Sequence, residues 1–208
     1  MSNNQVLYQG AEAKIIRSTF LNMSVICKTR LKKRYRIKEI DQRLIRSRTK
    51  DEAKLMTLAR QQGVCVPIVF DIDLERGVLT LQYLTGVRVK DCFNDFTVEQ
   101  KKKICKQIGS DIARLHNADI IHGDLTTSNL IYDNDRLFFI DFGLGEINPD
   151  VEAKGVDLHV LMEAIESTHS AFASFFSFVI EGYKQVYNGN ADEVKKKIDD
   201  IVRRGRYR

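Results

Sequence analysis

The sequence predicts an α+β protein in two parts, a small antiparallel sheet with one helix followed by a mostly helical region. Short apolar segments with tight turns between them occupy the first part, and one long amphipathic stretch interrupts them. Helix-type spacing of apolar residues dominates the second part. With 208 residues, of which 43% are hydrophobic, the chain can bury a core and form one domain with two lobes.

Five strands are expected in the first part, at residues 5–8, 13–20, 23–29, 66–73 and 78–84. Only the short breaks Gly10-Ala11 and Leu21-Asn22 separate the first three, so these strands should be antiparallel neighbours. A long helix is expected from Glu39 to Gln62, and Gly63 supplies its C-terminal cap. Residues 84–86 should then connect the two parts.

The long helix carries a carboxylate on its apolar face. Leu55, Met56 and Ala59 follow Glu52 by three, four and seven positions, so all four side chains share one side of the helix. A carboxylate that is buried in this way needs a partner.

The second part begins with a well-marked helix. Thr97 and Gln100 form a capping box, and apolar side chains recur at helical spacing as far as about His116. The polar stretch HGDLTTSN, residues 122–129, comes next, followed by a hairpin whose second strand leads to Asp141. Further helices are expected at residues 156–167, 171–187 and 191–204. The chain is interpreted as one domain, with lobes at 1–84 and 85–202 and a basic tail at 203–208.

Charge and composition narrow the function. No apolar run approaches the roughly 20 residues that span a bilayer, the first residues do not resemble a signal peptide, and the four cysteines lack metal-ligand spacing. A cytoplasmic protein with reduced thiols is expected. The net charge is +5, and basic residues concentrate at 28–38 and 203–208. Such patches favour a polyanionic partner, nucleic acid first, although a solvated loop and a frayed tail would have the same pattern.

Three oxygen-bearing side chains converge on the hairpin. Asp124 and Asn129 precede its first strand and Asp141 ends its second, so all three should lie at one end. Oxygen ligands in this number suit Mg²⁺, which keeps waters and shares itself with phosphate oxygens. Each residue alone is more often a simple turn residue. With Phe142 and Gly143, however, the pattern Asp-x-x-x-x-Asn followed by Asp-Phe-Gly matches the catalytic and metal-binding signatures of protein kinases.

The expected fold is therefore a reduced, bilobal protein-kinase-like fold with a small sheet lobe and a truncated, mostly helical lobe. Lys28 and Glu52 supply the ion pair that this fold requires upstream of the loop. The departures from ordinary kinases are also informative. One glycine replaces the glycine-rich loop, Gly123 stands where an arginine would read a phosphorylated segment, and only fifteen residues lie between Asp141 and Asp157. Neither a phosphorylation switch nor a peptide-docking platform is expected.

These features resemble one family in particular, the small atypical kinase subunit of the KEOPS complex, also called the p53-related kinase family. The resemblance rests on Gly10–Ala13, Tyr35-Arg36, Arg48-Thr49, Glu52-Ala53, His122–Asn129, Asp141–Leu144, Lys154–Leu158 and Arg204–Arg208. The last two elements distinguish it from RIO kinases.

The resemblance implies a function as well as a fold. It implies ATP and Mg²⁺ as cofactors, ATPase and serine/threonine kinase activity, and support of threonylcarbamoyladenosine formation in tRNA. The partners would be the threonylcarbamoyl-transferring subunit, a small activating subunit and tRNA. The location would be cytoplasmic, and also nuclear in a eukaryote.

The resemblance also assigns a role to each candidate residue. Asp124 would accept the proton of the attacking hydroxyl or orient a water, Lys28 would contact the phosphates, and Asp141 would bind Mg²⁺ with help from Asn129. The other nucleotide-binding candidates are Gly10, Ala11, Glu12, Ala13, Glu52, Gln82 and Leu84. The candidates for RNA contact are Arg203, Arg204, Arg206 and Arg208. Lys154 is either a residue near the reaction centre or a solvent-exposed lysine.

Two residues beside the site are interpreted as supports. Asp157 should accept backbone N–H bonds from the loop, and His122 is more readily a packing residue than a proton carrier. Two other functions stay open at this point, a small-molecule kinase of the aminoglycoside or choline type and a pseudokinase that binds partners without turnover. The chain is short for the first, and the intact lysine and metal positions argue against the second.

Overall fold

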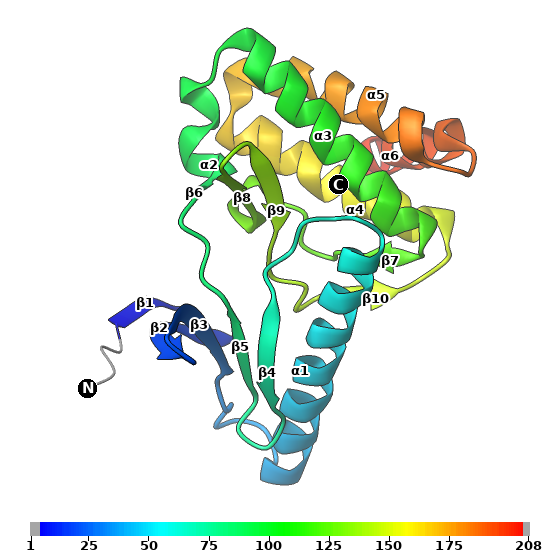
Figure 1. Cartoon of the computed structure of the whole chain (residues 1–208). Helices are drawn as coiled ribbons and strands as arrows, with labels where there is room; N and C mark the ends of the chain where they lie inside the picture. Colours follow the sequence, from blue (N-terminus) through cyan, green and yellow to red (C-terminus); the bar gives the residue numbers. More distant parts are fainter. Residues whose placement is uncertain (1–4, 206–208) are drawn as a thin grey trace. The chain divides into compact units, whose positions relative to one another are not determined.

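The computed structural model describes residues 5–205 and divides into two compact units (Figure 1). The first unit comprises Met1–Thr57 and Pro67–Thr85, and the second comprises Leu58–Val66 and Gly86–Arg208. Residues 58–66, which the sequence interpretation placed with the first part, therefore belong to the second unit. The fold class is the expected one, α+β with an antiparallel sheet at the start and helices later.

The first unit holds a five-stranded sheet in the order β1-β2-β3-β5-β4, and every pairing in it is antiparallel. Its strands are β1 (Gln5–Gln9), β2 (Ala13–Phe20), β3 (Met23–Arg30), β4 (Val69–Asp73) and β5 (Val78–Gln82). Lys28 pairs with Ile15 on one side and Leu79 on the other, so it lies on the central strand. β4 begins later than expected because Pro67 has no N–H with which to join a ladder.

Helix α1 (Lys38–Gln61) ends at the predicted glycine cap. Gly63 has a φ of +79°, and its N–H donates to the carbonyl of Arg60. This bond satisfies one of the carbonyls that the end of a helix leaves open. Leu55 and Met56 lie on the buried face of α1, and so does Glu52, which is only 1% exposed. The helix thus brings a carboxylate into the interior of the first unit.

The second unit contains the remaining elements. They are β6 (Val87–Arg88), α2 (Val89–Cys92), η1 (Phe93–Asp95), α3 (Val98–Asn117), β7 (Ile120–Ile121), η2 (Thr127–Asn129), β8 (Leu130–Asp133), β9 (Arg136–Phe139), β10 (Glu146–Ile147), α4 (Val151–Thr168), η3 (Ser170–Phe175), α5 (Phe176–Val186) and α6 (Ala191–Gly205). Strands β6, β8 and β9 form one small antiparallel sheet, and β7 pairs with β10. Among the described helices, none is long and apolar enough to cross a membrane.

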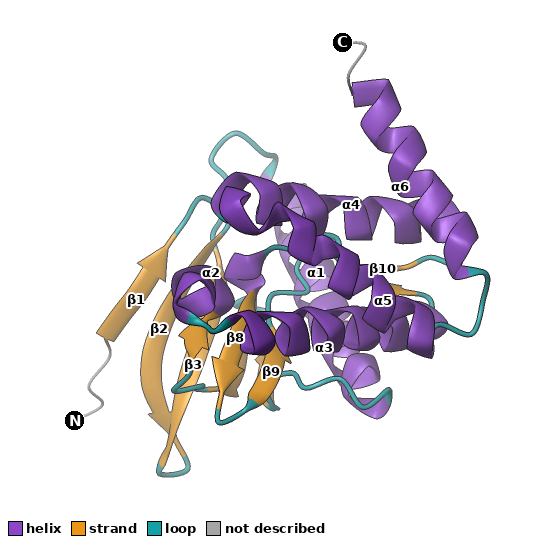
Figure 2. Ribbon diagram, turned by 90° about the horizontal axis from the view of Figure 1, so that it is seen from above, coloured by secondary structure: helices purple, strands orange, loops and turns teal. Residues whose placement is uncertain are grey.

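Two glycines let helices α3 and α5 pack closely side by side (Figure 2). A Cβ on Gly109 of α3 would lie 1.9 Å from the carbonyl oxygen of Val179, and one on Gly182 of α5 would lie 2.0 Å from that of Lys106. Because no side chain fits at either place, the two backbones approach each other directly. The predicted capping box at the start of α3 is confirmed, with Thr97 and Gln100 bonded in both directions.

Three helix boundaries differ from the sequence prediction. Helix α4 begins at Val151, earlier than expected, and its Gly155 packs against α6, where an added Cβ would lie 2.6 Å from the Cβ of Lys197. The helix expected at 171–187 is divided into η3 and α5. Helix α6 continues to residue 205, so Arg203 and Arg204 belong to a helix and not to a separate tail. Arg206 and Arg208 lie outside the described residues.

Candidate active site

In the first unit, one buried carboxylate holds two cations. Lys28 Nζ lies 2.6 Å from Glu52 Oε1, and Arg30 Nη2 lies 2.6 Å from Glu52 Oε2. The side chains of Lys28, Arg30 and Glu52 are 8%, 9% and 1% exposed. The expected pair of Lys28 and Glu52 is therefore present, with a further partner that the sequence interpretation missed. Arg30 follows Lys28 by two positions on β3, so strand alternation places both on one face and could have revealed it.

The Gly10–Glu12 turn is held by the basic segment that follows β3. The N–H of Gly10 donates to the carbonyl of Ala13 at 3.0 Å, which closes the turn. Lys33 Nζ donates to the carbonyl of Ala11 at 2.6 Å and lies 2.9 Å from Glu12 Oε1. This hydrogen bond and charge keep the pKa of Glu12 below its ordinary value. The four positions expected to meet the nucleotide are thus anchored to the rest of the unit.

The basic segment 28–38 is therefore not a free cationic surface, as the sequence interpretation suggested it could be. Lys28 and Arg30 are bound to Glu52, Lys33 to Glu12, and Arg36 to Asp41 at 3.4 Å. The exposed basic residues of the segment are Lys32, Arg34 and Lys38. Most of the charge in this run stabilises the first unit itself.

Gln82 and Leu84 are the nucleotide-binding candidates at the end of β5, next to the segment that connects the two parts. The N–H of Gln82 donates to the carbonyl of Ile68 at 2.8 Å, and the side-chain Oε1 of Gln82 accepts from the N–H of Ile68 at 3.2 Å. The N–H of Gln82 is consequently engaged, so its carbonyl is the backbone group that could meet a base. Leu84 is buried and follows the end of β5.

In the second unit, Asp124 and Asn129 are joined directly. Asn129 Nδ2 donates to both the carbonyl oxygen and Oδ2 of Asp124, at 2.9 Å each. The N–H of Ile140 donates to the carbonyl of Asn129 at 3.0 Å, which links this loop to the strand that leads into Asp141. The hairpin therefore places Asp124, Asn129 and Asp141 at one end, as the sequence predicts.

Asp141 has an unusual backbone. Its φ is +64°, in the left-handed region that non-glycine residues rarely adopt, and its side chain is exposed. Oδ1 of Asp141 accepts from the N–H of Gly143 at 3.2 Å, while Phe142 between them is buried. Such strain at a polar position is typical of functional sites. It turns the carboxylate outward while Phe142 stays in the core.

The donor set fits Mg²⁺ shared with a phosphate ligand. Asp141 offers carboxylate oxygens, and Asn129 offers the carbonyl oxygen of an amide whose nitrogen is bound to Asp124. Within residues 5–205, no group of three or more His, Cys, Asp or Glu side chains could hold a metal by itself. A cation bound here would take its other ligands from water or phosphate oxygens, as Mg²⁺ commonly does.

Asp157 of α4 accepts backbone hydrogen bonds from the loop that carries Asp124, as predicted. Oδ2 of Asp157 accepts from the N–H of His122, and Oδ1 accepts from that of Gly123, both at 2.9 Å. The buried His116 adds a third contact, with Nε2 at 3.2 Å from Oδ2. The carboxylate thus fixes two successive peptide groups immediately before Asp124.

His122 is a buried, neutral positioning residue. Its Nδ1 accepts from the N–H of Asp124 at 3.3 Å, so Nε2 carries the proton and donates to the carbonyl of Ile140 at 3.1 Å. Burial lowers the pKa of His122 against the opposing charge of Asp157. The ring also packs on Phe142, with centroids 4.5 Å apart. It ties Asp124 to the strand before Asp141, in agreement with the packing interpretation.

Gly123 cannot be replaced without a clash. Its φ is +79°, and an added Cβ would lie 2.2 Å from the carbonyl oxygen of Leu144. A side chain at position 123, an arginine included, would therefore require the loop to shift.

Lys154 is buried, and the structure joins it to a residue away from the loop. It is 5% exposed, so of the two alternatives for Lys154 the solvent-exposed lysine is wrong. Its Nζ donates to Asp119 Oδ1 at 2.7 Å. Asp119 precedes β7 whereas Asp124 follows it, so the bond lies at the other end of that strand from the catalytic loop.

Arg203 and Arg204, the two candidates for RNA contact that the structure describes, each pair with a carboxylate. Arg203 is paired with Asp200 within α6, and Arg204 Nη1 lies 3.2 Å from Glu152 Oε1 of α4. Both remain largely exposed, so their outer surfaces are open to a ligand.

The sheet with its lysine–glutamate pair, and the hairpin with its two aspartates and asparagine, together define a chain of the protein-kinase-like class. The family model for the RIO domain matches residues 13–145. The chain is 42% identical to the KEOPS complex subunit Bud32 of Pyrococcus abyssi, over 98% of this chain and 96% of that protein. It is 39% identical to a probable serine/threonine-protein kinase BUD32 homolog of Archaeoglobus fulgidus, over 97% and 95%. The chain therefore belongs to the RIO-domain family and, within it, to the Bud32 type of atypical kinase.

Two further comparisons concern a longer relative and the fold. One longer relative is a probable bifunctional tRNA threonylcarbamoyladenosine biosynthesis protein of Methanothermobacter thermautotrophicus, to which the chain is 43% identical. The match covers 97% of this chain and 36% of that protein. The structure of Rio2 kinase from Chaetomium thermophilum matches with a TM-score of 0.70 and 16% identity, over 96% of this chain and 65% of that one. At this identity the likeness concerns the fold alone. The RIO match ends at residue 145, before the Lys154–Leu158 element that the sequence interpretation used to distinguish the chain from RIO kinases.

Proposed function

We propose that the protein is a Mg²⁺-dependent ATPase and atypical serine/threonine kinase. The observation that carries the proposal is the hairpin end, where Asn129 binds Asp124 directly and Ile140 links the loop to Asp141. In a phosphotransferase these three positions supply the base and the metal ligands. Lys28, held by Glu52, would contact the α- and β-phosphates.

The residues have separate tasks in the reaction. Asp141 and the carbonyl of Asn129 would hold Mg²⁺, which when bound neutralises charge on the phosphate oxygens. Asn129 Nδ2 holds Oδ2 of Asp124, so Oδ1 is the oxygen that would take the proton from the attacking hydroxyl or water. The carboxylate of Glu52, 2.6 Å from Lys28 Nζ, would hold that ammonium in place for the phosphates.

We further propose that this chemistry serves tRNA modification in a KEOPS complex. The support is that full-length relatives include a protein named as the KEOPS subunit Bud32, and that bifunctional relatives named for tRNA threonylcarbamoyladenosine biosynthesis contain a segment like this chain. The partners would be a threonylcarbamoyl-transferring subunit, a small activating subunit and tRNA, in the cytoplasm. Arg203, Arg204, Arg206 and Arg208 would contact the tRNA backbone. A small-molecule kinase is less well supported, because the relatives that match over their whole length are Bud32 proteins.

The test is ATP hydrolysis by single-site variants, measured with and without tRNA and the partner subunits. Asp124→Ala and Asp141→Ala should each abolish hydrolysis while tRNA binding stays near normal. Asp199→Ala is the matched control, since it removes an exposed carboxylate from α6 and should hydrolyse ATP normally. Full hydrolysis by both site variants would refute the assigned site. Stimulation by tRNA with its partners supports the KEOPS role, whereas stimulation by a small alcohol or amine alone contradicts it.

A further inference from the structure

Arg30 ties strand β3 to helix α1 and to the turn between β4 and β5, all within the first unit. Its N–H donates to the carbonyl of Gly77 in that turn at 3.0 Å. Nη2 of its guanidinium lies 2.6 Å from Glu52 Oε2, and the same nitrogen donates to the carbonyl of Arg48 at 3.4 Å. Arg48 and Glu52 are neighbours one turn apart on α1, so one guanidinium holds both a side chain and the backbone of that helix.

The two cations on Glu52 fix how its carboxylate is turned. Oε1 lies 2.6 Å from Lys28 Nζ, and Oε2 lies 2.6 Å from Arg30 Nη2. Glu52 is only 1% exposed, so water cannot take the place of either cation unless the unit opens. Without the guanidinium, Oε2 would be a buried acceptor that has lost its donor. The carboxylate would then turn to share the ammonium of Lys28 between its two oxygens, and that ammonium would move.

Arginine suits this position better than lysine would. A guanidinium is planar, stays charged and carries its donors in fixed directions, whereas a lysine ammonium is a compact charge on a flexible stem. It can therefore hold the carboxylate of Glu52 and the backbone of α1 at the same time. Strand alternation places Lys28 and Arg30 on the same face of β3, so both cations reach the same carboxylate.

We propose that Arg30 is a positioning residue for nucleotide binding, and that it acts through Glu52 on the ammonium of Lys28. This rests on the proposed function, in which Lys28 contacts the α- and β-phosphates. Protein kinases need their lysine–glutamate pair in place for phosphate transfer, and they control it by positioning the helix that carries the glutamate. Here Arg30 fixes that helix against β3 before any nucleotide binds. The first unit therefore offers a preformed phosphate contact, which saves the free energy of ordering it during binding.

A second arginine offers a matched control, because it also ties α1 to the turn between β4 and β5. Arg46 Nη1 lies 2.8 Å from Glu75 Oε1, and the two side chains are 59% and 73% exposed. An exposed pair of this kind contributes little to stability. Arg46→Met thus removes the same charge from the same part of the unit and leaves the carboxylate of Glu52 with both of its cations.

The test compares a ligand that has phosphates with one that has none. ADP carries the two phosphates that Lys28 would contact, and adenosine carries neither. In Arg30→Met the dissociation constant of ADP with Mg²⁺ should rise about tenfold, while that of adenosine stays unchanged, because only the phosphate contact is misplaced. Arg30→Lys keeps the charge without the fork and should weaken ADP about threefold. Arg46→Met should bind both ligands like the unaltered protein, as measured by NMR titration of the full chain.

The amide resonances of α1 test whether the contact is preformed. Those of residues 48–52 should move little when ADP binds to the unaltered protein. In Arg30→Met the same resonances should be displaced in the free protein and return toward their unaltered positions as ADP is added. If the unaltered protein shows a displacement on binding as large as that of the variant, the nucleotide and not Arg30 fixes the helix, and the proposal is wrong.

The outcomes separate this positioning role from the proposed function. If Lys28→Met binds ADP as tightly as the unaltered protein, the proposed role of Lys28 fails, and that of Arg30 fails with it. If Lys28→Met loses ADP affinity but Arg30→Met does not, or loses ADP and adenosine affinity equally, only the role of Arg30 is overturned. A melting curve shows whether Arg30→Met folds. Should it not fold, Arg30→Lys decides, and an ADP affinity equal to that of the unaltered protein would overturn the proposal.

Discussion

The buried charges around Glu52 allow a sharp test of how the first unit is stabilised. One carboxylate there serves Lys28 and Arg30, with each cation on its own oxygen at 2.6 Å. Glu52→Gln leaves two buried cations facing a neutral amide. Breaking a buried ion pair from one side typically costs about 3–5 kcal/mol, so this variant should lose about that much stability.

Removing one cation should cost less. In Arg30→Met or Lys28→Met, the carboxylate keeps one partner, so the loss is about that of a hydrogen bond to a charged group, about 1.5–3 kcal/mol. Arg30→Met has a compensating gain, because the Nε of Arg30 is buried with no partner among the described residues. It should therefore be the mildest of the three changes.

The double variant Lys28→Met/Arg30→Met is the decisive measurement. It leaves the Glu52 carboxylate, which is 1% exposed, without either cation. The loss should exceed the sum of the single losses by about 1–3 kcal/mol, since residues in one network are not additive. Urea unfolding followed by circular dichroism supplies the free energies. Arg17→Met is the control in the same sheet, where the guanidinium lies over the Tyr83 ring, and it should lose under about 1 kcal/mol. Additivity of the double variant within about 0.5 kcal/mol would refute this reasoning.

Two further predictions concern stability. Gly123→Ala and Gly63→Ala both place Ala at a φ of +79°, yet a Cβ meets nothing within 4 Å at position 63 and lies 2.2 Å from the Leu144 carbonyl at position 123. Thermal melting should give a loss of about 1–2 kcal/mol for Gly63→Ala and a larger loss for Gly123→Ala, and equal losses would contradict the clash. Burial raises the pKa of Asp111 from 3.8 to about 6, against the charge of Arg114. The folded state then binds more protons than the unfolded one between these values, so stability falls as pH rises through them, and the advantage of Asp111→Asn should grow by about 2 kcal/mol from pH 4.5 to pH 7. A difference that does not change with pH would contradict the raised pKa.

Where one local rule decides the outcome, the sequence was a good guide. The capping box at Thr97 and the glycine cap at Gly63 follow from short-range hydrogen bonding, and both are present. The pair of Lys28 and Glu52 was expected from the match to the kinase signatures, and helix periodicity placed Glu52 on the buried face of α1. Asp157 was predicted to accept backbone N–H groups, and it does so twice.

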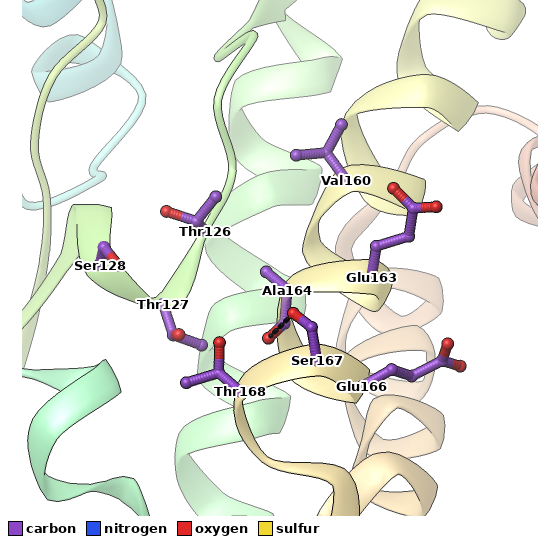
Figure 3. Close-up of a pocket in the computed structure, with 9 residues that line it drawn as sticks. All are labelled: Thr126, Thr127, Ser128, Val160, Glu163, Ala164, Glu166, Ser167 and Thr168. Atoms are coloured by element: carbon purple, nitrogen blue, oxygen red, sulfur yellow. Dashed lines mark hydrogen bonds between the residues drawn. The ribbon is translucent and has the colours of Figure 1, made fainter.

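The missed features depend on contacts between segments that are distant in sequence. Lys33 looked like part of a nucleic-acid patch. Nothing in the nearby sequence shows that its ammonium pairs with Glu12, which lies just before β2. Lys154 looked exposed or catalytic, and its partner Asp119 is 35 residues away. Gly155 of α4 packs against α6, where an added Cβ would lie 2.6 Å from the Cβ of Lys197, and no pattern within α4 reveals this contact. An open hollow between residues 126–128 and the C-terminal half of α4 is likewise a property of tertiary packing (Figure 3).

Gly123 combines both kinds of information and bears on regulation. The sequence shows that the arginine of ordinary kinases is absent, and this alone suggests that no phosphorylated segment is read. The structure adds that no side chain fits, because the loop closes on the Leu144 carbonyl while Asp157 holds the peptide N–H of Gly123. Restoring an arginine would therefore not restore a phosphate switch, since it would first displace the loop that carries Asp124.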